Sequence, residues 1–451
     1  QARVLGGRLR RNANWTIELA LDYAGAGFYP DAVELLKANL SQKSETAVYP
    51  MIYYYLAAFS SRAGEKEQAE TYLALAAKAE GEPCFPHRVQ DILVLRECLE
   101  LNPRDSRGWS YLGNCLYDKR RYEEAIAAWE RSRELDERYP TARRNLALAY
   151  FNKRGDRESA RKELEAAFAL DTGDARVLME LDQLYKKIGV SPEERLAFLE
   201  RNRDCAFLRD DLYVEYVTLL NLTNQPEEAL KRIENRRFHP WEGGEGRVIA
   251  QYIASLVQLA KERIQKKSFG EAVELLKRAT VYPENLGEGK LAGAKENDIY
   301  YWLGVSYAGL GQSERANECF LKAAQGDEEP AGMMFYNDQP PEMVFYKGLA
   351  LRALGRQGDA ARCFGKLVEY GQAHENDAVK IDYFAVSLPD LMVFEEDLNE
   401  RNRAHCRFMT ALGLLGGGKT EPARELLTGI LQINPNHLSV KVHLELLEWN
   451  L

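Results

Sequence analysis

The sequence predicts an all-α protein in which antiparallel helix pairs stack into a right-handed superhelical solenoid. One spacing recurs along the chain: a large apolar residue is followed nine positions later by alanine, and four positions after that by a second large residue. Its clearest copies are Leu116, Ala125 and Trp129, and Tyr307, Ala316 and Phe320. Apolar residues elsewhere follow helical spacing, and no stretch of useful length alternates with the two-residue period of a strand.

Two copies of the spacing carry a longer upstream pattern. They read Trp109-x-x-Leu112-Gly113-x-x-Leu116 and Tyr300-x-x-Leu303-Gly304-x-x-Tyr307. The small residues let two antiparallel helices approach closely, because a larger side chain would push their backbones apart. The pattern resembles the tetratricopeptide repeat (TPR). Since one pair cannot bury its apolar faces alone, neighbouring pairs must stack into a TPR-type solenoid.

The elements follow in order as about ten helical pairs. We expect these pairs at residues 14–40, 51–80, 106–137, 141–170, 175–201, 211–235, 247–281, 297–325, 341–370 and 403–433. An extra helix at 87–101 ends before Pro103, and the pair at 403–433 ends before Pro435, because proline cannot continue a helix. A last helix at 438–449 caps the array. We expect a linker at 1–13, one TPR array at 14–235, and a second array with irregular loops and the capping helix at 236–451.

Composition and charge exclude several functions. The chain has 60 basic and 69 acidic residues and a net charge of −9, which argues against sequence-independent nucleic-acid binding. No apolar run approaches the ~20 residues of a membrane helix. The first eleven residues contain four arginines but no long apolar stretch, so they do not form a secretory signal. We expect them to be a linker, in which case the natural protein extends further.

The cysteine pattern indicates a reducing compartment. The seven cysteines are scattered, odd in number and form no C-x-x-C pair: Cys84, Cys98, Cys115, Cys205, Cys319, Cys363 and Cys406. Most lie within helical patterns, where a free cysteine behaves as a small hydrophobic residue. This pattern favours a cytoplasmic protein without disulfides.

One segment imitates a nucleotide site. Residues 413–420 match G-x-x-x-x-G-K-[ST] in every position. A real P-loop follows a β-strand and wraps phosphates with backbone amides, whereas the preceding residues here have a helical pattern. We expect the glycines to fall on an interhelical turn and Thr420 to cap the next helix. The histidines show no metal-ligand spacing and no serine lies in a G-x-S-x-G turn, so we expect no metal, cofactor or catalytic triad.

Three irregular stretches interrupt the repeat, at residues 238–246, 282–290 and 383–391, the last followed by the acidic run 395–397. Additional residues in a solenoid collect in loops on one face, which is often the binding face. From these stretches, and from the segment 401–405 into which the third one leads, we take ten candidate ligand- or partner-binding residues: His239, Trp241, Glu242, Glu245, Asn285, Lys290, Asp390, Asp397, Arg401 and His405.

The cluster at residues 239–245 has two interpretations. Trp241 beside Glu242 and Glu245 could stack on a sugar ring and hydrogen-bond its hydroxyls. Alternatively, Trp241 plugs a gap between repeats and the glycines serve the backbone shape. We expect the loops at residues 238–246, 282–290 and 383–390 to converge on one surface, because three long departures from a regular repeat are hard to explain as independent accidents.

The irregular stretches also resemble a bacterial family of two-part proteins. In that family a β-sandwich domain, related to sugar-processing folds, precedes a TPR array. The resemblance is carried by residues 237–246, 282–290, 383–391 with Asp397, and 401–406. It covers only the C-terminal half of such a protein. It implies that any activity of the β-sandwich lies outside these residues.

The leading functional hypothesis is a non-catalytic scaffold. Its concave surface would bind a protein partner or the chain's own missing N-terminal domain. The alternative is the helical part of a carbohydrate-active enzyme, in which the irregular loops complete a sugar site with Glu242, Glu245 and Asp390 as carboxylates.

Overall fold

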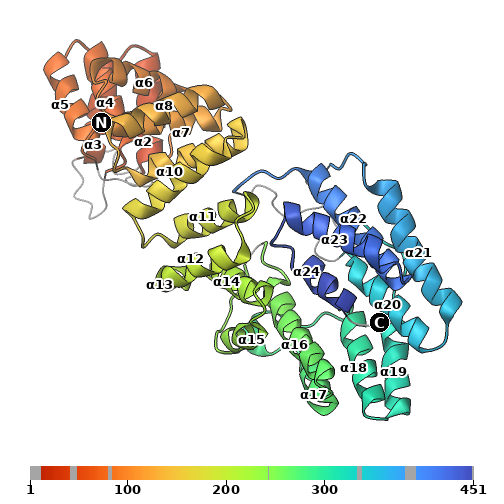
Figure 1. Cartoon of the computed structure of the whole chain (residues 1–451). Helices are drawn as coiled ribbons and strands as arrows, with labels where there is room; N and C mark the ends of the chain where they lie inside the picture. Colours follow the sequence, from red (N-terminus) through yellow and green to blue (C-terminus); the bar gives the residue numbers. More distant parts are fainter. Residues whose placement is uncertain are drawn as a thin grey trace. The chain divides into compact units, whose positions relative to one another are not determined.

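The computed structural model describes residues 12–40, 48–79, 84–241, 243–332, 338–380 and 393–448 (Figure 1). All regular structure within these ranges is helical. The chain divides into two compact units, which we call unit 1 (residues 1–171) and unit 2 (residues 172–451). The boundary expected from the sequence, at residues 235 and 236, lies inside unit 2.

The described residues of unit 1 form four antiparallel pairs and one single helix. The pairs are α2 (Ala13–Gly25) with α3 (Tyr29–Leu40), α4 (Met51–Arg62) with α5 (Lys66–Ala76), α7 (Ser106–Asp118) with α8 (Tyr122–Leu135), and α9 (Pro140–Ala149) with α10 (Arg157–Leu170). The single helix α6 (Val89–Leu101) stands at the predicted place, before Pro103. A π-helical turn, η1 (Tyr150–Arg154), continues α9.

In unit 2, the part of the chain that the structure describes forms six pairs and a terminal helix. The pairs are α11 (Ala175–Lys187) with α12 (Pro192–Arg201), α14 (Asp210–Leu222) with α15 (Pro226–Glu234), α16 (Arg247–Gln265) with α17 (Phe269–Ala279), α18 (Asn297–Gly309) with α19 (Ser313–Ala323), α20 (Pro341–Ala353) with α21 (Gln357–His374), and α22 (Leu398–Gly416) with α23 (Thr420–Ile433). The shorter elements are α13 (Arg203–Ala206), η2 (Glu284–Leu286), α24 (Leu438–Glu445) and η4 (Leu446–Glu448). The predicted all-α, TPR-type solenoid is confirmed.

A glycine in the first helix of a pair meets an aromatic ring in the second. A Cβ added to Gly113 would lie 2.5 Å from Trp129, and one added to Gly304 would lie 2.5 Å from Phe320. The same contact joins Gly348 to Phe364 at 2.4 Å. In each case the ring lies sixteen positions after the glycine in the sequence. The predicted role of the small residues is therefore confirmed, and Ala125 and Ala316 are buried as expected.

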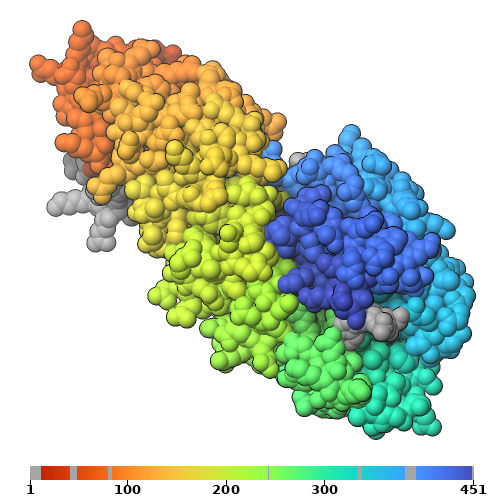
Figure 2. Space-filling model, viewed as in Figure 1, coloured from red at the N-terminus to blue at the C-terminus, as the bar shows by residue number. Residues whose placement is uncertain are grey.

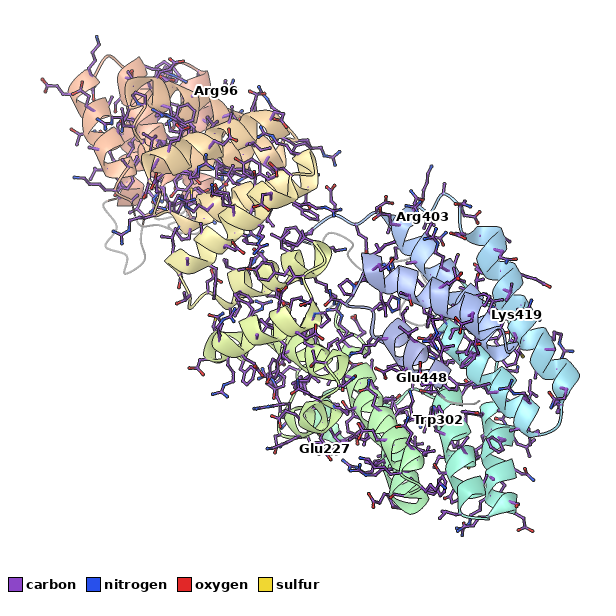
Figure 3. All side chains as sticks on the ribbon, in the orientation of Figure 1. Arg96, Glu227, Trp302, Arg403, Lys419 and Glu448 are labelled. Carbon is purple, nitrogen blue, oxygen red and sulfur yellow. The ribbon has the colours of Figure 1, made fainter. Side chains whose placement is uncertain are left out.

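The P-loop-like segment is helical over its first four residues. Gly413 and Gly416 lie in α22, and only Gly417, Gly418 and Lys419 form the turn before α23 (Figure 3). A Cβ on Gly413 would lie 2.6 Å from the Phe364 carbonyl oxygen of α21. The expectation that Thr420 caps α23 is wrong: Lys419 is the N-cap residue, and its side chain makes no capping hydrogen bond. Gly413 and Gly416 therefore serve helix packing, since an added Cβ on Gly416 would also lie 2.2 Å from the Phe364 ring.

Two glycines in adjacent helices provide a test of this packing. We expect Gly413→Ala to destabilise unit 2 by about 1–3 kcal/mol, because its methyl group would meet a backbone carbonyl that cannot rotate away. Gly429 in α23 has no atom within 4 Å of its added Cβ, so Gly429→Ala should stabilise by up to about 1 kcal/mol. Urea unfolding followed by circular dichroism measures both. Equal effects of the two substitutions would contradict the packing role.

Candidate functional site

The first two irregular loops of unit 2 are joined by hydrogen bonds. The Phe238 N–H donates to the Asn285 carbonyl at 2.8 Å. The Asn285 side chain donates to the carbonyls of Ile233 and Arg236, both at 2.9 Å. The Gly246 N–H donates to the Glu288 carboxylate at 2.9 Å. We call residues 236–241, 243–246 and 282–290 the loop platform.

His239 stands at the surface of the loop platform. Its side chain is 79% exposed, while its backbone N–H donates to Asp210 at 3.0 Å. The Arg236 guanidinium also donates to Asp210, at 2.6 Å, and stacks over the Tyr213 ring at 4.2 Å. Burial opposes ionisation of Asp210, but the donors from His239 and Arg236 outweigh it and hold the pKa below its ordinary value. The platform is therefore anchored to the start of α14.

Trp241 packs against its own loop. Its indole lies so near Gly244 that an added Cβ there would be 2.1 Å from Cε2. The side chain is nevertheless only half-buried, and Glu245 beside it is exposed. Glu242 falls outside the described residues. Trp241 thus makes a structural contact within its loop and remains partly exposed.

The remaining candidate residues make local contacts. Lys290 bonds to the Thr280 carbonyl at 2.8 Å and to Glu296 at 2.6 Å. Asp397 caps α22 by accepting the N–H groups of Asn399 and Glu400, which explains why this helix begins before the predicted residue 403. Arg401 pairs with Glu396 at 3.6 Å. Asp390 and the rest of the stretch 383–391 lie outside the described residues.

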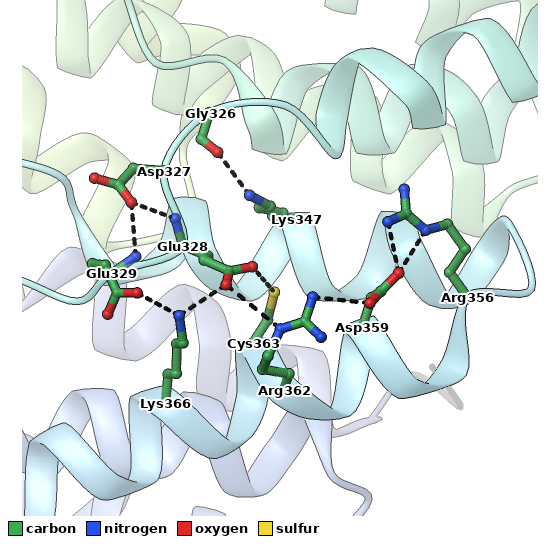
Figure 4. A network of polar contacts seen from close by, with 10 residues as sticks. All are labelled: Gly326, Asp327, Glu328, Glu329, Lys347, Arg356, Asp359, Arg362, Cys363 and Lys366. Carbon is green, nitrogen blue, oxygen red and sulfur yellow. Dashed lines mark hydrogen bonds and ion pairs between the residues drawn. The ribbon is translucent and has the colours of Figure 1, made fainter.

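His405 supports a loop that the sequence analysis did not single out. Its Nε2 bonds to the Ala331 carbonyl at 3.0 Å, and burial lowers its pKa. The same loop is held against α20 and α21 by an ionic network (Figure 4). Lys366 bonds to Glu328 at 2.8 Å, and Lys347 donates to the Gly326 carbonyl at 2.7 Å. This network is structural, since each charge is matched by a partner within the fold.

The C-terminal segment, residues 434–448, packs inside unit 2 against the first helices of several pairs. The His443 ring lies 5.6 Å from the rings of Phe345 in α20 and Phe408 in α22. The Lys441 ammonium bonds to the carbonyl of Leu222, the last residue of α14. In the space-filling view this dark-blue segment lies directly against the green helices (Figure 2). We call the face of α14, α16, α20 and α22 that receives it the groove.

A buried ionic cluster anchors the turn before α24. Arg195 is fully buried and binds Asp182 through two hydrogen bonds, at 2.6 and 3.1 Å. It also binds Glu215 at 2.8 Å and the Asn436 side chain at 2.6 Å. The Asn436 amide in turn donates to the Val190 carbonyl at 3.3 Å. Arg195 stands on the apolar stripe Pro192, Leu196 and Leu199. A charge on such a stripe was the available sequence signal for this contact.

Ionisable side chains line the groove. Burial lowers the pKa of Lys261 in α16 to about 8, although Glu445 of α24 acts in the opposite direction. Beside the groove, on α18, burial raises the pKa of Asp298 to about 6. Burial also raises the pKa of Glu342 in α20, although Ser439 acts in the opposite direction. All of these shifts arise because low-dielectric surroundings disfavour the charged form.

The two histidines of the C-terminal segment are held neutral by burial. It lowers the pKa of His437 to about 4 and that of His443 to about 3. His437 Nδ1 accepts the Val440 N–H at 3.3 Å and so caps α24, a role that requires an unprotonated nitrogen. His443 Nδ1 donates to the Ser439 carbonyl, and its Nε2 has no hydrogen-bond partner among the described residues. Protonation of either ring would therefore oppose docking of α24.

A pocket of about 330 Å³ lies beside the end of the C-terminal segment. Its walls come from the α14–α15 turn, α16, α24 and η4: Asn224, Pro226, Gln258, Lys261, Glu262, Gln265, Glu445 and Glu448. The Gln258 Oε1 atom is buried and has no hydrogen-bond partner among the described residues. Most of the side chains that line the pocket are polar or charged.

In unit 1, two asparagines bridge successive first helices. The Asn145 side chain of α9 donates to Asn114 of α7 at 3.0 Å, and Trp129 Nε1 donates to the same oxygen at 3.0 Å. Both asparagines are half-buried. The Asn145 side-chain oxygen in turn accepts a hydrogen bond from Arg144 at 3.2 Å, so the two amides link α7 and α9.

These features define a helical-repeat protein of paired antiparallel helices. A TPR repeat model matches residues 113–154, and a tetratricopeptide repeat model matches residues 298–328. The chain therefore carries tetratricopeptide repeats in both units. None of the described helices is long and apolar enough to cross a membrane.

Solved structures of TPR proteins resemble parts of the chain. YrrB, described as having an unusual peptide-binding site, is 17% identical, with 51% of this chain and 90% of that chain covered and a TM-score of 0.28. TTC0263, a thermophilic TPR protein of Thermus thermophilus, is 20% identical, with 46% and 99% covered and a TM-score of 0.27. PilF of Pseudomonas aeruginosa is 18% identical, with 51% and 91% covered and a TM-score of 0.28.

The buried histidine in the groove predicts an acid-sensitive fold. Because the pKa of His443 is about 3 in the folded state and about 6.5 when unfolded, only the unfolded state gains its proton between these values. The free energy of unfolding should fall by on the order of 1 kcal/mol per pH unit from pH 6.5 downward. The raised pKa values of Asp298 and Glu342 favour the folded state as the pH falls, which opposes the effect of His443. Both carboxyl groups are also present in a variant of His443, so their contribution cancels when the variant is compared with the wild type.

Comparison with His443→Phe isolates the effect, since phenylalanine keeps a ring between Phe345 and Phe408. Urea unfolding of both proteins from pH 7.5 to pH 4.5 should show a shallower loss of stability in the variant. Parallel curves would contradict a neutral, buried His443.

Proposed function

We propose that this chain is a non-catalytic scaffold that binds a protein through the first-helix faces of its repeats. The partner is a separate protein or the N-terminal β-sandwich domain that the two-part resemblance implies. One observation carries the proposal: the groove of unit 2 already holds a polypeptide helix, packed through Val440, His443 and Leu446, which are 0%, 3% and 0% exposed. A surface that buries one helix of its own chain has the chemistry of a peptide-binding surface.

Unit 1 offers a comparable face in which the amides of Asn114 and Asn145 connect α7 and α9. Asparagine supplies both a donor and an acceptor, which matches the pairing needs of a peptide backbone. Removing Asn114 leaves the fold supported, because Trp129 Nε1 also donates to the Ser110 carbonyl at 3.2 Å. This residue therefore allows binding to be tested separately from folding.

Selection of twelve-residue peptides from a displayed library against the full chain tests the proposal. Selected peptides should bind wild-type protein and lose about tenfold in affinity with Asn114→Ala or Asn145→Ala, as expected for one lost hydrogen bond. Arg161→Ala, on the exposed side of α10, is the control and should bind like wild type. Equal affinities of all three variants for every peptide would overturn binding at this face.

The loop platform supports a second candidate function, sugar binding. His239 and the partly exposed side chain of Trp241 stand beside Glu245 on loops held together by Asn285 and Glu288. An aromatic ring beside polar groups on a preorganised loop is suited to a sugar ring. In this alternative Glu242 and Asp390 would supply further carboxylates, Lys290 and Asn285 would position the loops, and Asp397, Arg401 and His405 would act from α22.

Tryptophan fluorescence tests the sugar proposal. Titration with glucose, N-acetylglucosamine, maltose and cellobiose should change the emission of the wild-type chain and leave Trp241→Phe unchanged. Trp15→Phe, which removes an exposed indole in unit 1, is the control and should respond like wild type. A response that survives Trp241→Phe, or no response to any sugar, would reject the role of this residue. A loss of about 3–5 kcal/mol in Trp241→Ala would instead indicate a structural plug.

A further inference from the structure

We propose that the groove of unit 2 is a binding site for an amphipathic helix of a partner protein, and that α24 occupies it as an exchangeable internal ligand. The inference rests on the scaffold function proposed above and names the chemistry of one partner. Its first support is the way α24 is held. The segment contacts helices from α14 to α22, and its buried apolar and aromatic residues, Val440, His443 and Leu446, follow one another at three-residue spacing.

α24 cannot be helical by itself. It spans eight residues, followed by one 3-10 turn, whereas isolated helices shorter than about 12–15 residues are marginal in water. Its helical structure therefore depends on docking into the groove. Undocking would release the segment as a flexible chain and leave the receiving face open. Docking and folding of α24 are one step, which is the behaviour of a bound peptide.

The groove also stabilises its occupant less than an apolar core would. Lys261 and His443 are at most 6% exposed, and Glu342 lies near Ser439 at the same interface. Burying ionisable groups opposes docking unless each is fully paired. His443 Nε2 and Gln258 Oε1 have no hydrogen-bond partner among the described residues. A partner that satisfied more of these groups could displace α24.

The sequence of α24 gives the expected chemistry of that partner. It places a hydroxyl at Ser439 for Glu342, apolar or aromatic residues at the positions of Val440, His443 and Leu446, and a carboxylate at Glu445 for Lys261. The 330 Å³ pocket continues the groove past Glu445, next to Gln258.

Peptide binding in trans to the full chain tests the inference. The probe is a fluorescein-labelled peptide of residues 434–448, and the opened protein carries Val440→Asp and Leu446→Asp. Fluorescence anisotropy should show at least about tenfold tighter binding to the opened protein than to wild type, because the internal segment no longer competes. Ile433→Asp, which alters an apolar side chain already 70% exposed at the end of α23, is the control and should bind as weakly as wild type.

A charge exchange identifies the site. Adding Lys261→Glu to the opened protein should weaken binding of the probe, and a peptide with lysine in place of Glu445 should restore it. A folded opened protein that fails to bind the probe would overturn the inference, and so would binding that ignores Lys261. The peptide selections on unit 1 do not depend on either outcome.

Hydrogen exchange on the wild-type chain decides the matter if the opened protein does not fold. The inference expects the amides of α24 to exchange by local opening, faster than those of α16 and α20. Exchange of α24 only together with those helices would show that it is an integral part of the core and would overturn the proposal.

Discussion

The contact on which the repeats depend is a glycine of one helix lying against an aromatic ring of the next. A glycine inside a helix costs about 1 kcal/mol relative to alanine, so it must be offset by packing. At Gly113, Gly304 and Gly348 the offset is visible, because a single added carbon would enter the opposing ring. Phe364 extends the principle: it meets Gly348 of α20 and also Gly416 of α22, so one ring sets the approach of three helices.

Close pairing places the first helices of successive pairs side by side, and their faces form one surface. In unit 2 the C-terminal segment, residues 434–448, packs against this surface. Arg195 is central to this arrangement, since it is buried with two carboxylates and the Asn436 amide. Burial opposes the charge of Glu215, but Lys186 and Arg195 outweigh it and hold its pKa below the ordinary value. Removing one member of such a cluster would leave an uncompensated buried charge, so the cluster is held together as a unit. Because Asn436 binds Arg195, the cluster also fixes the position at which the C-terminal segment turns.

Local spacing in the sequence predicted the helix pairs, the single helix α6 and the glycine contacts, because these depend on residues within about one repeat. It did not predict the filled groove. The Arg195–Asn436 contact joins residues 241 positions apart, and no repeat spacing encodes such a separation. Two charged residues that contact or neighbour the C-terminal segment, Arg195 and Lys261, could be recognised in the sequence. Each of them interrupts an apolar helical stripe. Thr420 was wrongly predicted to cap α23, because threonine favours the N-cap position but the sequence did not show that the helix begins at Thr420 itself.

For the candidate site, the interruptions of the repeat predicted where the loops lie but not the structural role of each residue in them. Asn285 hydrogen-bonds two carbonyls of the neighbouring loop, and Gly287 has a φ of +80° where a Cβ would lie 2.7 Å from the Phe238 carbonyl oxygen. Both residues give the loop platform its shape, and only His239, Trp241 and Glu245 of the described candidates remain accessible at its first loop. A loop stiffened in this way loses little conformational entropy when it binds.

The groove has the opposite character, because its occupant must undock before another helix can enter. Preorganisation therefore favours the loop platform for a small ligand, whereas the polar groove favours a partner whose binding is coupled to release of α24.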